Sequence, residues 1–138
     1  MPRAYINIGS NIGDRRANIA RAVTAVSALP VSDLRISALY SSKPWGYDSP
    51  NDYLNQGVSF DTPLAPEALL QALLEIERSI NVTPHRTPEG EYADRVLDID
   101  LIAMEGTRMS TAGLTLPHPR ASQRDFVMKP LIETLKSI

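Results

Sequence analysis

The chain has 138 residues, of which 43% are hydrophobic and 22% are charged, and its formal net charge is −2. A chain of this length fits one domain over residues 1–138 with its own core, and the small net charge argues against a general affinity for nucleic acid or an anionic membrane surface. It has no cysteine and two histidines, which argues against disulfides, thiolate chemistry and a histidine-rich zinc site.

Signals that would send the chain to or through a membrane are missing from the sequence. No apolar run approaches the roughly 18 residues that a membrane-spanning helix needs. The first residues also lack the pattern of a signal peptide. We therefore expect a cytoplasmic protein.

Apolar periodicity and turn residues predict the elements in chain order. Asp14, after the turn GSNIGD, is a suitable N-cap for the first helix, and Pro30 is a suitable stop. Pro66 suits the first turn of the second helix. The expected elements are a strand over residues 3–9, a helix from Asp14 to about Leu29, strands over about 33–40 and 53–61, a helix from Pro66 to about Ile80, a strand within 95–106, a short strand within 113–119 and a short helix from about Pro130.

Three of these strands should bury one face and leave the other polar, because apolar and polar residues alternate along them. The order β-α-β-β-α-β with a C-terminal extension predicts an α+β, ferredoxin-like fold, an antiparallel sheet with both helices on one face. We expect a ligand on the opposite face, beneath the loops 41–51 and 81–94. That face carries Tyr5, Asn7, Tyr53, Asn55, Asp98 and Asp100.

The pair Asp98 and Asp100, in the stretch RVLDIDLI, is unusual because Asp is disfavoured in strands. At positions i and i+2 the two carboxylates share a face, roughly 6.5–7 Å apart along the strand. The pair fits a solvated strand face neutralised by Arg95. It equally fits a site for Mg²⁺, which takes one or two carboxylates together with substrate phosphates.

Other side chains have a structural and a functional interpretation. His118 fits a surface loop or a phosphate donor, and the arginines 95, 120 and 124 fit solvated charges or bidentate phosphate ligands. Tyr53 and Phe126 fit core aromatics or platforms for a flat heterocycle. The turn GSNIGD is not a Walker A loop, and no GxGxxG supports dinucleotide binding.

Together these stretches resemble the 6-hydroxymethyl-7,8-dihydropterin pyrophosphokinase family of folate biosynthesis. The resemblance covers nearly the whole chain, and its most specific part is the pair LDIDLI and LPHPR…RDFV. The five matching stretches, in order, are INIGSNIGDRRANI, SALYSSKPWG, DYLNQGV, DRVLDIDLI and LTLPHPRASQRDFVMKPL.

The resemblance implies that pyrophosphate passes from ATP to the hydroxymethyl oxygen of the pterin, which leaves AMP. It implies two Mg²⁺ ions on Asp98 and Asp100, with Arg95 also catalytic. The expected pterin-binding residues are Ser42, Pro44, Trp45, Tyr53, Asn55 and Phe126. The expected ATP-binding residues are Glu77, Arg86, Arg95, Thr115, His118 and Arg124.

The segment before the carboxylate strand departs from the family pattern. The usual Gly-Arg-x-Arg and Arg-Trp-Gly-Pro-Arg segments are replaced by NVTPHR and EYADR, so that only Arg95 is kept and Tyr92 stands where Trp is common. Arg86 is the only arginine within residues 81–94, and we hypothesise that it reaches the ATP phosphates. A milder change is Ser42-Lys43 in place of Thr-Pro.

Two competing interpretations remain open at this point. A catalytically inactive relative would bind the pterin or the nucleotide without transfer, and only the altered segment 81–94 favours it. An RNA-binding domain would need several stacking aromatics and basic residues on its open face, whereas this face carries two aspartates. The expected partners are ATP and the reduced pterin, with no nucleic acid or membrane, and a monomer is the working expectation.

Overall fold

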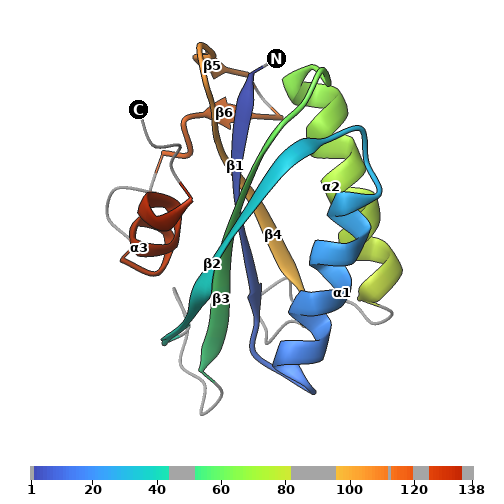
Figure 1. The fold of residues 1–138 in the computed structure, drawn as a ribbon, viewed down its shortest axis with the longest axis vertical. Helices are drawn as coiled ribbons and strands as arrows, with labels where there is room; N and C mark the ends of the chain where they lie inside the picture. The colour runs from blue at the N-terminus through green and yellow to red at the C-terminus, as the bar shows by residue number, and fades with distance from the viewer. Residues whose placement is uncertain (1, 44–51, 82–95, 112, 120–124, 135–138) are drawn as a thin grey trace.

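The computed structural model describes residues 2–43, 52–81, 96–111, 113–119 and 125–134. Within these ranges the chain forms a four-stranded sheet, a two-stranded pair and three helices (Figure 1). The elements in chain order are β1 (Arg3–Ser10), α1 (Arg15–Ser27), β2 (Ser32–Ser42), β3 (Tyr53–Asp61), α2 (Pro66–Ile80), β4 (Asp98–Met104), β5 (Met109–Ser110), β6 (Thr115–Leu116) and α3 (Asp125–Glu133).

The larger sheet has the strand order β2-β3-β1-β4, and every neighbouring pair in it is antiparallel. The central strand β1 is buried along its whole length. Helices α1 and α2 lie together on one face of this sheet (Figure 1). Buried apolar residues form the core between the sheet and these two helices. They are Ala4, Ile6, Ile8, Ile19, Ala22, Val26, Val58, Phe60, Leu69, Leu73, Ile76, Leu97, Ile99, Leu101, Met104 and Leu116.

The two long helices begin where the sequence predicts. The Asp14 carboxylate accepts a hydrogen bond from the Ala17 N–H at 3.2 Å, which satisfies one free donor of the first turn of α1. Helix α2 has no side-chain cap, but Pro66 in its first turn needs no N–H partner. Both predictions are confirmed, and β3 and α2 also span the predicted residues.

The C-terminal helix differs from the prediction. We expected it to begin near Pro130, but α3 begins at Asp125 and contains Pro130 in its interior. Proline in a helix interior removes a backbone hydrogen bond, so packing has to compensate. Pro130 lies against Gly57, where a Cβ atom would come within 2.7 Å of the Pro130 Cβ.

Helix α3 also changes the character of the second sheet face. It packs there against β2 and β3, opposite α1 and α2, so the face is not open along its whole length (Figure 1). Tyr5, Ile102 and Val127 form a second buried cluster between sheet and helix. Burial, and to a smaller extent the nearby Glu105, raises the pKa of the Tyr5 phenol. Ligand access on this face is therefore confined to the part that α3 leaves uncovered.

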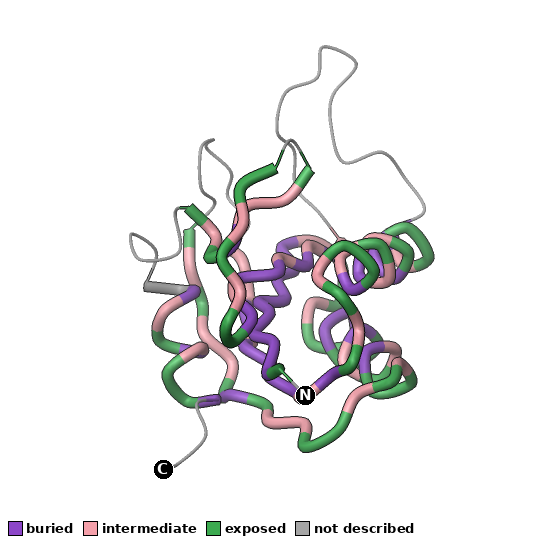
Figure 2. Tube along the Cα trace, turned by 90° about the horizontal axis from the view of Figure 1, so that it is seen from above, coloured by how far each residue is buried: buried purple, intermediate pink, exposed green. Residues whose placement is uncertain are grey.

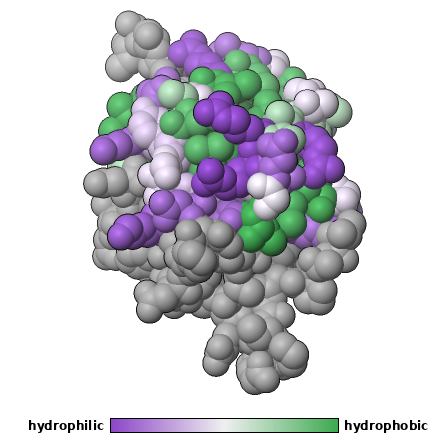
Figure 3. All heavy atoms as spheres, turned by 90° about the horizontal axis from the view of Figure 1, so that it is seen from below, coloured by the Kyte–Doolittle hydropathy of each residue, from purple (hydrophilic) through white to green (hydrophobic). Residues whose placement is uncertain are grey.

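Buried residues concentrate in the strands and on the helix sides that face them (Figure 2). On the face seen in Figure 3, the coloured part mixes hydrophilic and hydrophobic side chains without one extended apolar patch. Among the described residues, no helix combines the length and apolarity needed to cross a membrane.

Candidate active site

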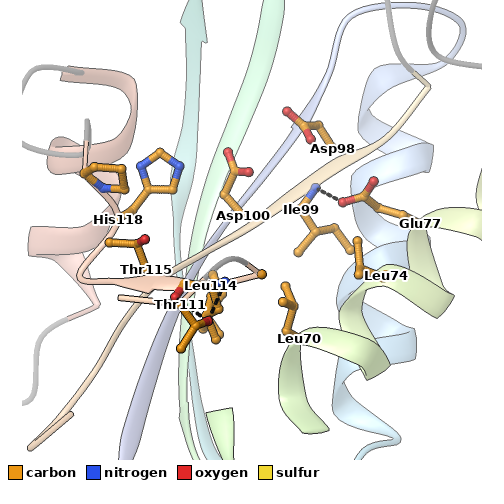
Figure 4. Close-up of a pocket in the computed structure, with 13 residues that line it drawn as sticks. Leu70, Leu74, Glu77, Asp98, Ile99, Asp100, Thr111, Leu114, Thr115 and His118 are labelled. Carbon is orange, nitrogen blue, oxygen red and sulfur yellow. Dashed lines mark hydrogen bonds between the residues drawn. The ribbon is translucent and has the colours of Figure 1, made fainter. Parts of the chain in front are cut away.

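Strand β4 carries both aspartates on one face. Asp98 and Asp100 are half-buried, and their partners on the neighbouring strand β1 are Gly9 and Asn7. Paired residues of adjacent strands point to the same side of the sheet. The two carboxylates therefore lie on the face away from α1 and α2. In the view of Figure 4, Asp100 lies between His118 and Asp98.

A pocket of about 440 Å³ follows β4, between α2 and the β5–β6 pair. Five residues predicted to act at the site, from three separate parts of the chain, line it together (Figure 4). They are Glu77, Asp98, Asp100, Thr115 and His118. The remaining lining residues are Leu70, Leu74, Ile99, Leu101, Thr111, Gly113, Leu114 and Pro119.

The chain after β6 is tied back to β4. The His118 backbone N–H donates to the Ile102 carbonyl at 2.7 Å. This bond keeps the half-buried imidazole close to the carboxylate strand. Thr115 reaches the same pocket from β6, where it pairs with Ser110 of β5.

Glu77 is buried in the last turns of α2, and its Oε2 accepts a hydrogen bond from the Ile99 N–H at 3.0 Å. It thus lines the pocket and holds the backbone of the carboxylate strand at the same time (Figure 4). The family resemblance implied that Glu77 binds ATP, but it did not predict this hydrogen bond to β4.

A second group of predicted residues lies on β2 and β3. The Asn55 side chain is 2% exposed, and its Nδ2 donates to the Tyr40 carbonyl at 3.2 Å and to Ser42 Oγ at 2.8 Å. Tyr53 is half-buried and pairs with Ser42 across the strands. The structure therefore brings Ser42, Tyr53 and Asn55 together.

Gly9 lies between the two groups, and sequence reasoning did not single it out. It pairs with Asn55 on one side and with Asp98 on the other. A Cβ at this position would come within 3.2 Å of both Asn55 Oδ1 and Tyr53 Cδ1. The missing side chain lets Asn55 and Tyr53 lie this close to β1. The available signal was a glycine inside a strand, which often marks close approach of a ligand or another backbone.

Several predicted site residues cannot be compared with the structure. Positions outside the described residues are Pro44, Trp45, Arg86, Arg95 and Arg124. Residue 126 lies in the first turn of α3, but the Phe126 side chain is not among those described.

Comparison with known proteins identifies the class and then the family. The chain is 41% identical over 134 residues to a protein of Methylorubrum extorquens, covering 96% of this chain and 82% of the relative. It is 35% identical to one of Porphyromonas gingivalis (95% and 89% covered) and 34% identical to one of Bacillus subtilis (98% and 79% covered). All three are named 2-amino-4-hydroxy-6-hydroxymethyldihydropteridine pyrophosphokinase.

The class is therefore that of the pyrophosphokinases. The family model for 7,8-dihydro-6-hydroxymethylpterin-pyrophosphokinase matches residues 5–136. The chain belongs to this family, as the sequence motifs indicated.

Proposed function

We propose that Asp98 and Asp100 hold the divalent cations through which this pyrophosphokinase passes pyrophosphate from ATP to 6-hydroxymethyl-7,8-dihydropterin. The reaction itself follows from the family, and the chain is an ATP-dependent pyrophosphokinase of folate biosynthesis. One observation carries the assignment of the site, namely that both carboxylates line one pocket with Glu77, Thr115 and His118.

The donors at Asp98 and Asp100 suit Mg²⁺. Among the described residues, no group of three or more His, Asp or Glu side chains is arranged to enclose a metal. Mg²⁺ does not need such a cage, because it retains waters and binds through one or two carboxylates together with substrate phosphates. When bound, two Mg²⁺ ions would offset the negative charge of the phosphates and of the departing AMP.

The remaining pocket residues support a nucleotide in this position. Leu70, Leu74 and Leu114 offer apolar surface for the adenine base. Thr115 and His118 offer a hydroxyl and an imidazole N–H for phosphate oxygens. The resemblance adds the arginines 86, 95 and 124 on the nucleotide side.

Asn55 suits the edge of a pterin ring. Its Nδ2 donates to two protein acceptors, and its Oδ1 is the amide atom turned toward Gly9. An amide oxygen accepts hydrogen bonds, and the amino and ring N–H groups of a pterin are donors. Tyr53 offers an aromatic surface next to this oxygen.

The distance between the Asn55 region and the Asp98 pocket supports transfer of pyrophosphate from a nucleotide in the pocket to a pterin at Asn55. Asn55, Gly9 and Asp98 lie on one line across three neighbouring strands. Two strand spacings of 4.7–4.9 Å put the backbones of Asn55 and Asp98 about 10 Å apart. A pterin held at Asn55 could then extend its hydroxymethyl group across Gly9 toward phosphates held at Asp98.

We also propose that the fold is ferredoxin-like. The antiparallel order β2-β3-β1-β4, with α1 and α2 on one face, supports this assignment. In this arrangement the polar ends of β1, β3 and β4 meet on the face opposite the two helices.

An assay of AMP release tests the proposed reaction. The purified chain is incubated with ATP and Mg²⁺, with and without the reduced pterin. We expect AMP and the pterin diphosphate in equal amounts, and only when both the pterin and Mg²⁺ are present. Binding of both ligands without AMP would instead identify a catalytically inactive relative.

A further inference from the structure

Within the described residues, side chains rather than another strand bond the outer edge of β4 at its beginning. In the described part of the chain β4 pairs with β1 alone in the four-stranded sheet, so backbone groups on its other edge need different partners. Successive residues of a strand direct their N–H and C=O groups to alternate edges. The N–H groups of Leu97 and Ile99 donate to side chains outside the sheet, so the outer edge at this end of β4 belongs to these two residues.

Asn81 directly follows α2 and hydrogen-bonds both backbone groups of Leu97. Its Nδ2 donates to the Leu97 carbonyl at 2.7 Å, and its Oδ1 accepts from the Leu97 N–H at 2.9 Å. The side-chain amide thereby imitates the backbone of a neighbouring strand. Asn81 is 9% exposed and Leu97 is fully buried, so water competes little for these bonds.

Glu77, four residues earlier, hydrogen-bonds the next outward-facing residue. Its Oε2 accepts from the Ile99 N–H at 3.0 Å, and the side chain is buried. The Asn81 N–H in turn donates to the Glu77 carbonyl at 2.8 Å, which ties both residues to the end of α2. We call Glu77 and Asn81 the α2 clamp.

The α2 clamp holds the peptide groups on both sides of Asp98. The Leu97 carbonyl belongs to the peptide unit that precedes the Asp98 Cα, and the Ile99 N–H belongs to the unit that follows it. Fixing both units restricts the two backbone dihedrals of Asp98 and hence the direction of its carboxylate. The helix that carries the clamp is itself fixed, because Leu69 and Leu73 of α2 lie in the core with exposures of 0% and 1%.

We propose that Asn81 is a positioning residue for this reaction, which acts by holding Asp98 in the direction that cation binding requires. The inference rests on the proposed role of Asp98 as a cation ligand. Residues that orient a metal ligand typically alter metal affinity 10–100-fold when they are replaced. Asn81 needs no contact with ATP or the pterin to have this effect.

The variant Asn81→Leu tests the proposal, because leucine is similar in size but can neither donate nor accept. We expect the Mg²⁺ concentration for half-maximal AMP release to rise about tenfold, with unchanged affinity for the pterin. Exchange of the Leu97 amide hydrogen, followed by NMR, should become faster. The matched control is Gln71→Leu, which removes an exposed amide from the same helix and should change neither quantity.

Mn²⁺ titration in the presence of a non-hydrolysable ATP analogue, followed by electron paramagnetic resonance, provides a second readout without turnover. If Asn81→Leu does not fold, Asn81→Asp replaces it, since it keeps the acceptor for the Leu97 N–H and loses the donor to the Leu97 carbonyl. Faster Leu97 exchange with unchanged Mg²⁺ and Mn²⁺ affinity would overturn the proposal and leave Asn81 a purely structural role. An inactive parent chain would count against the proposed function, while the Mn²⁺ titration would still decide on Asn81.

Discussion

At the scale of single residues, small distances around Gly9 decide whether a ligand fits beside Asn55 and Tyr53. A methyl group at Gly9 would lie 3.2 Å from Asn55 Oδ1 and from Tyr53 Cδ1. Both atoms belong to the surface that we propose for the pterin. A methyl group at Gly9 would therefore have to displace two side chains that we expect to hold the pterin.

Gly9→Ala should weaken pterin binding about tenfold, or about 1.4 kcal/mol, because the added methyl group would displace Asn55 Oδ1 and the Tyr53 ring from the positions in which we expect them to hold the pterin. The affinity for a non-hydrolysable ATP analogue should change little, since the three atoms nearest to the new methyl group belong to Asn55 and Tyr53, which do not line the pocket. Calorimetric titration of the variant with each ligand separately measures both effects. Equal weakening for the two ligands would show that Gly9 does not separate the two binding regions.

Not all site residues could be predicted from the sequence. The aspartates, Glu77, Thr115 and His118 were named because their motifs match a family, and the structure brings them to one pocket. Gly9 was missed because its importance depends on the register between β1 and β3. Asn81 was missed because its partner Leu97 lies 16 residues away, and hydrogen bonds from a side chain to distant backbone leave no periodic pattern.

At the scale of elements, α3 shows where sequence reasoning about helices fails. Proline propensity placed the start of this helix near Pro130, yet the helix begins at Asp125. Helix propensity is a weak prior that tertiary packing overrides. Here the packing partner is Gly57, a strand residue whose missing side chain admits Pro130, and neither residue alone reveals the contact.

Gly57→Ala should destabilise the fold by about 1–3 kcal/mol, the usual cost of overpacking. The new methyl group would lie 2.7–2.9 Å from the Pro130 Cβ, C and O atoms, two of which belong to the backbone. Helix α3 would have to move away from the sheet. The melting temperature measures the effect, and Gly113→Ala is the control because its Cβ meets no atom within 4 Å. Melting of Gly57→Ala at the parent's temperature would contradict this packing.

Helix α2 and strand β4 carry Glu77, Asp98 and Asp100 of the proposed site. The bounds of α2 were predictable from its apolar spacing and Pro66. The contacts of Glu77 and Asn81 with β4 were not, since they depend on how a helix end meets a strand edge. These contacts support our proposal that the end of α2 holds Asp98 in a fixed direction.

At the scale of the whole molecule, the proposed site requires an acidic pocket to bind a polyanion. Glu77, Asp98 and Asp100 share one pocket in a chain of net charge −2. Cations and arginines must therefore supply the positive charge for ATP. Figure 1 shows that α1 and α2 lie on one face of the sheet and that α3 lies on part of the other.

Arg86 is our hypothesis for part of this charge, because it is the only arginine between residues 81 and 94 of the sequence. Arg86→Ala should lower kcat about 10- to 100-fold, roughly 1.4–2.8 kcal/mol, with little change in pterin affinity. Arg86→Lys should restore only part of the rate, because lysine cannot form a bidentate contact with phosphate. Turnover of Arg86→Ala at the parent's rate would leave this role to Arg95 and Arg124.

The most direct test of the cation site compares the parent with Asp98→Asn and Asp100→Asn in pterin-dependent AMP formation at saturating Mg²⁺. Each variant keeps the size of the side chain and removes one negative charge. We expect turnover to fall at least about 100-fold, or roughly 2.7 kcal/mol, with a melting temperature no lower than the parent's, since one of two neighbouring like charges is gone. Turnover of both variants at the parent's rate would contradict the assignment of Asp98 and Asp100 as the cation ligands.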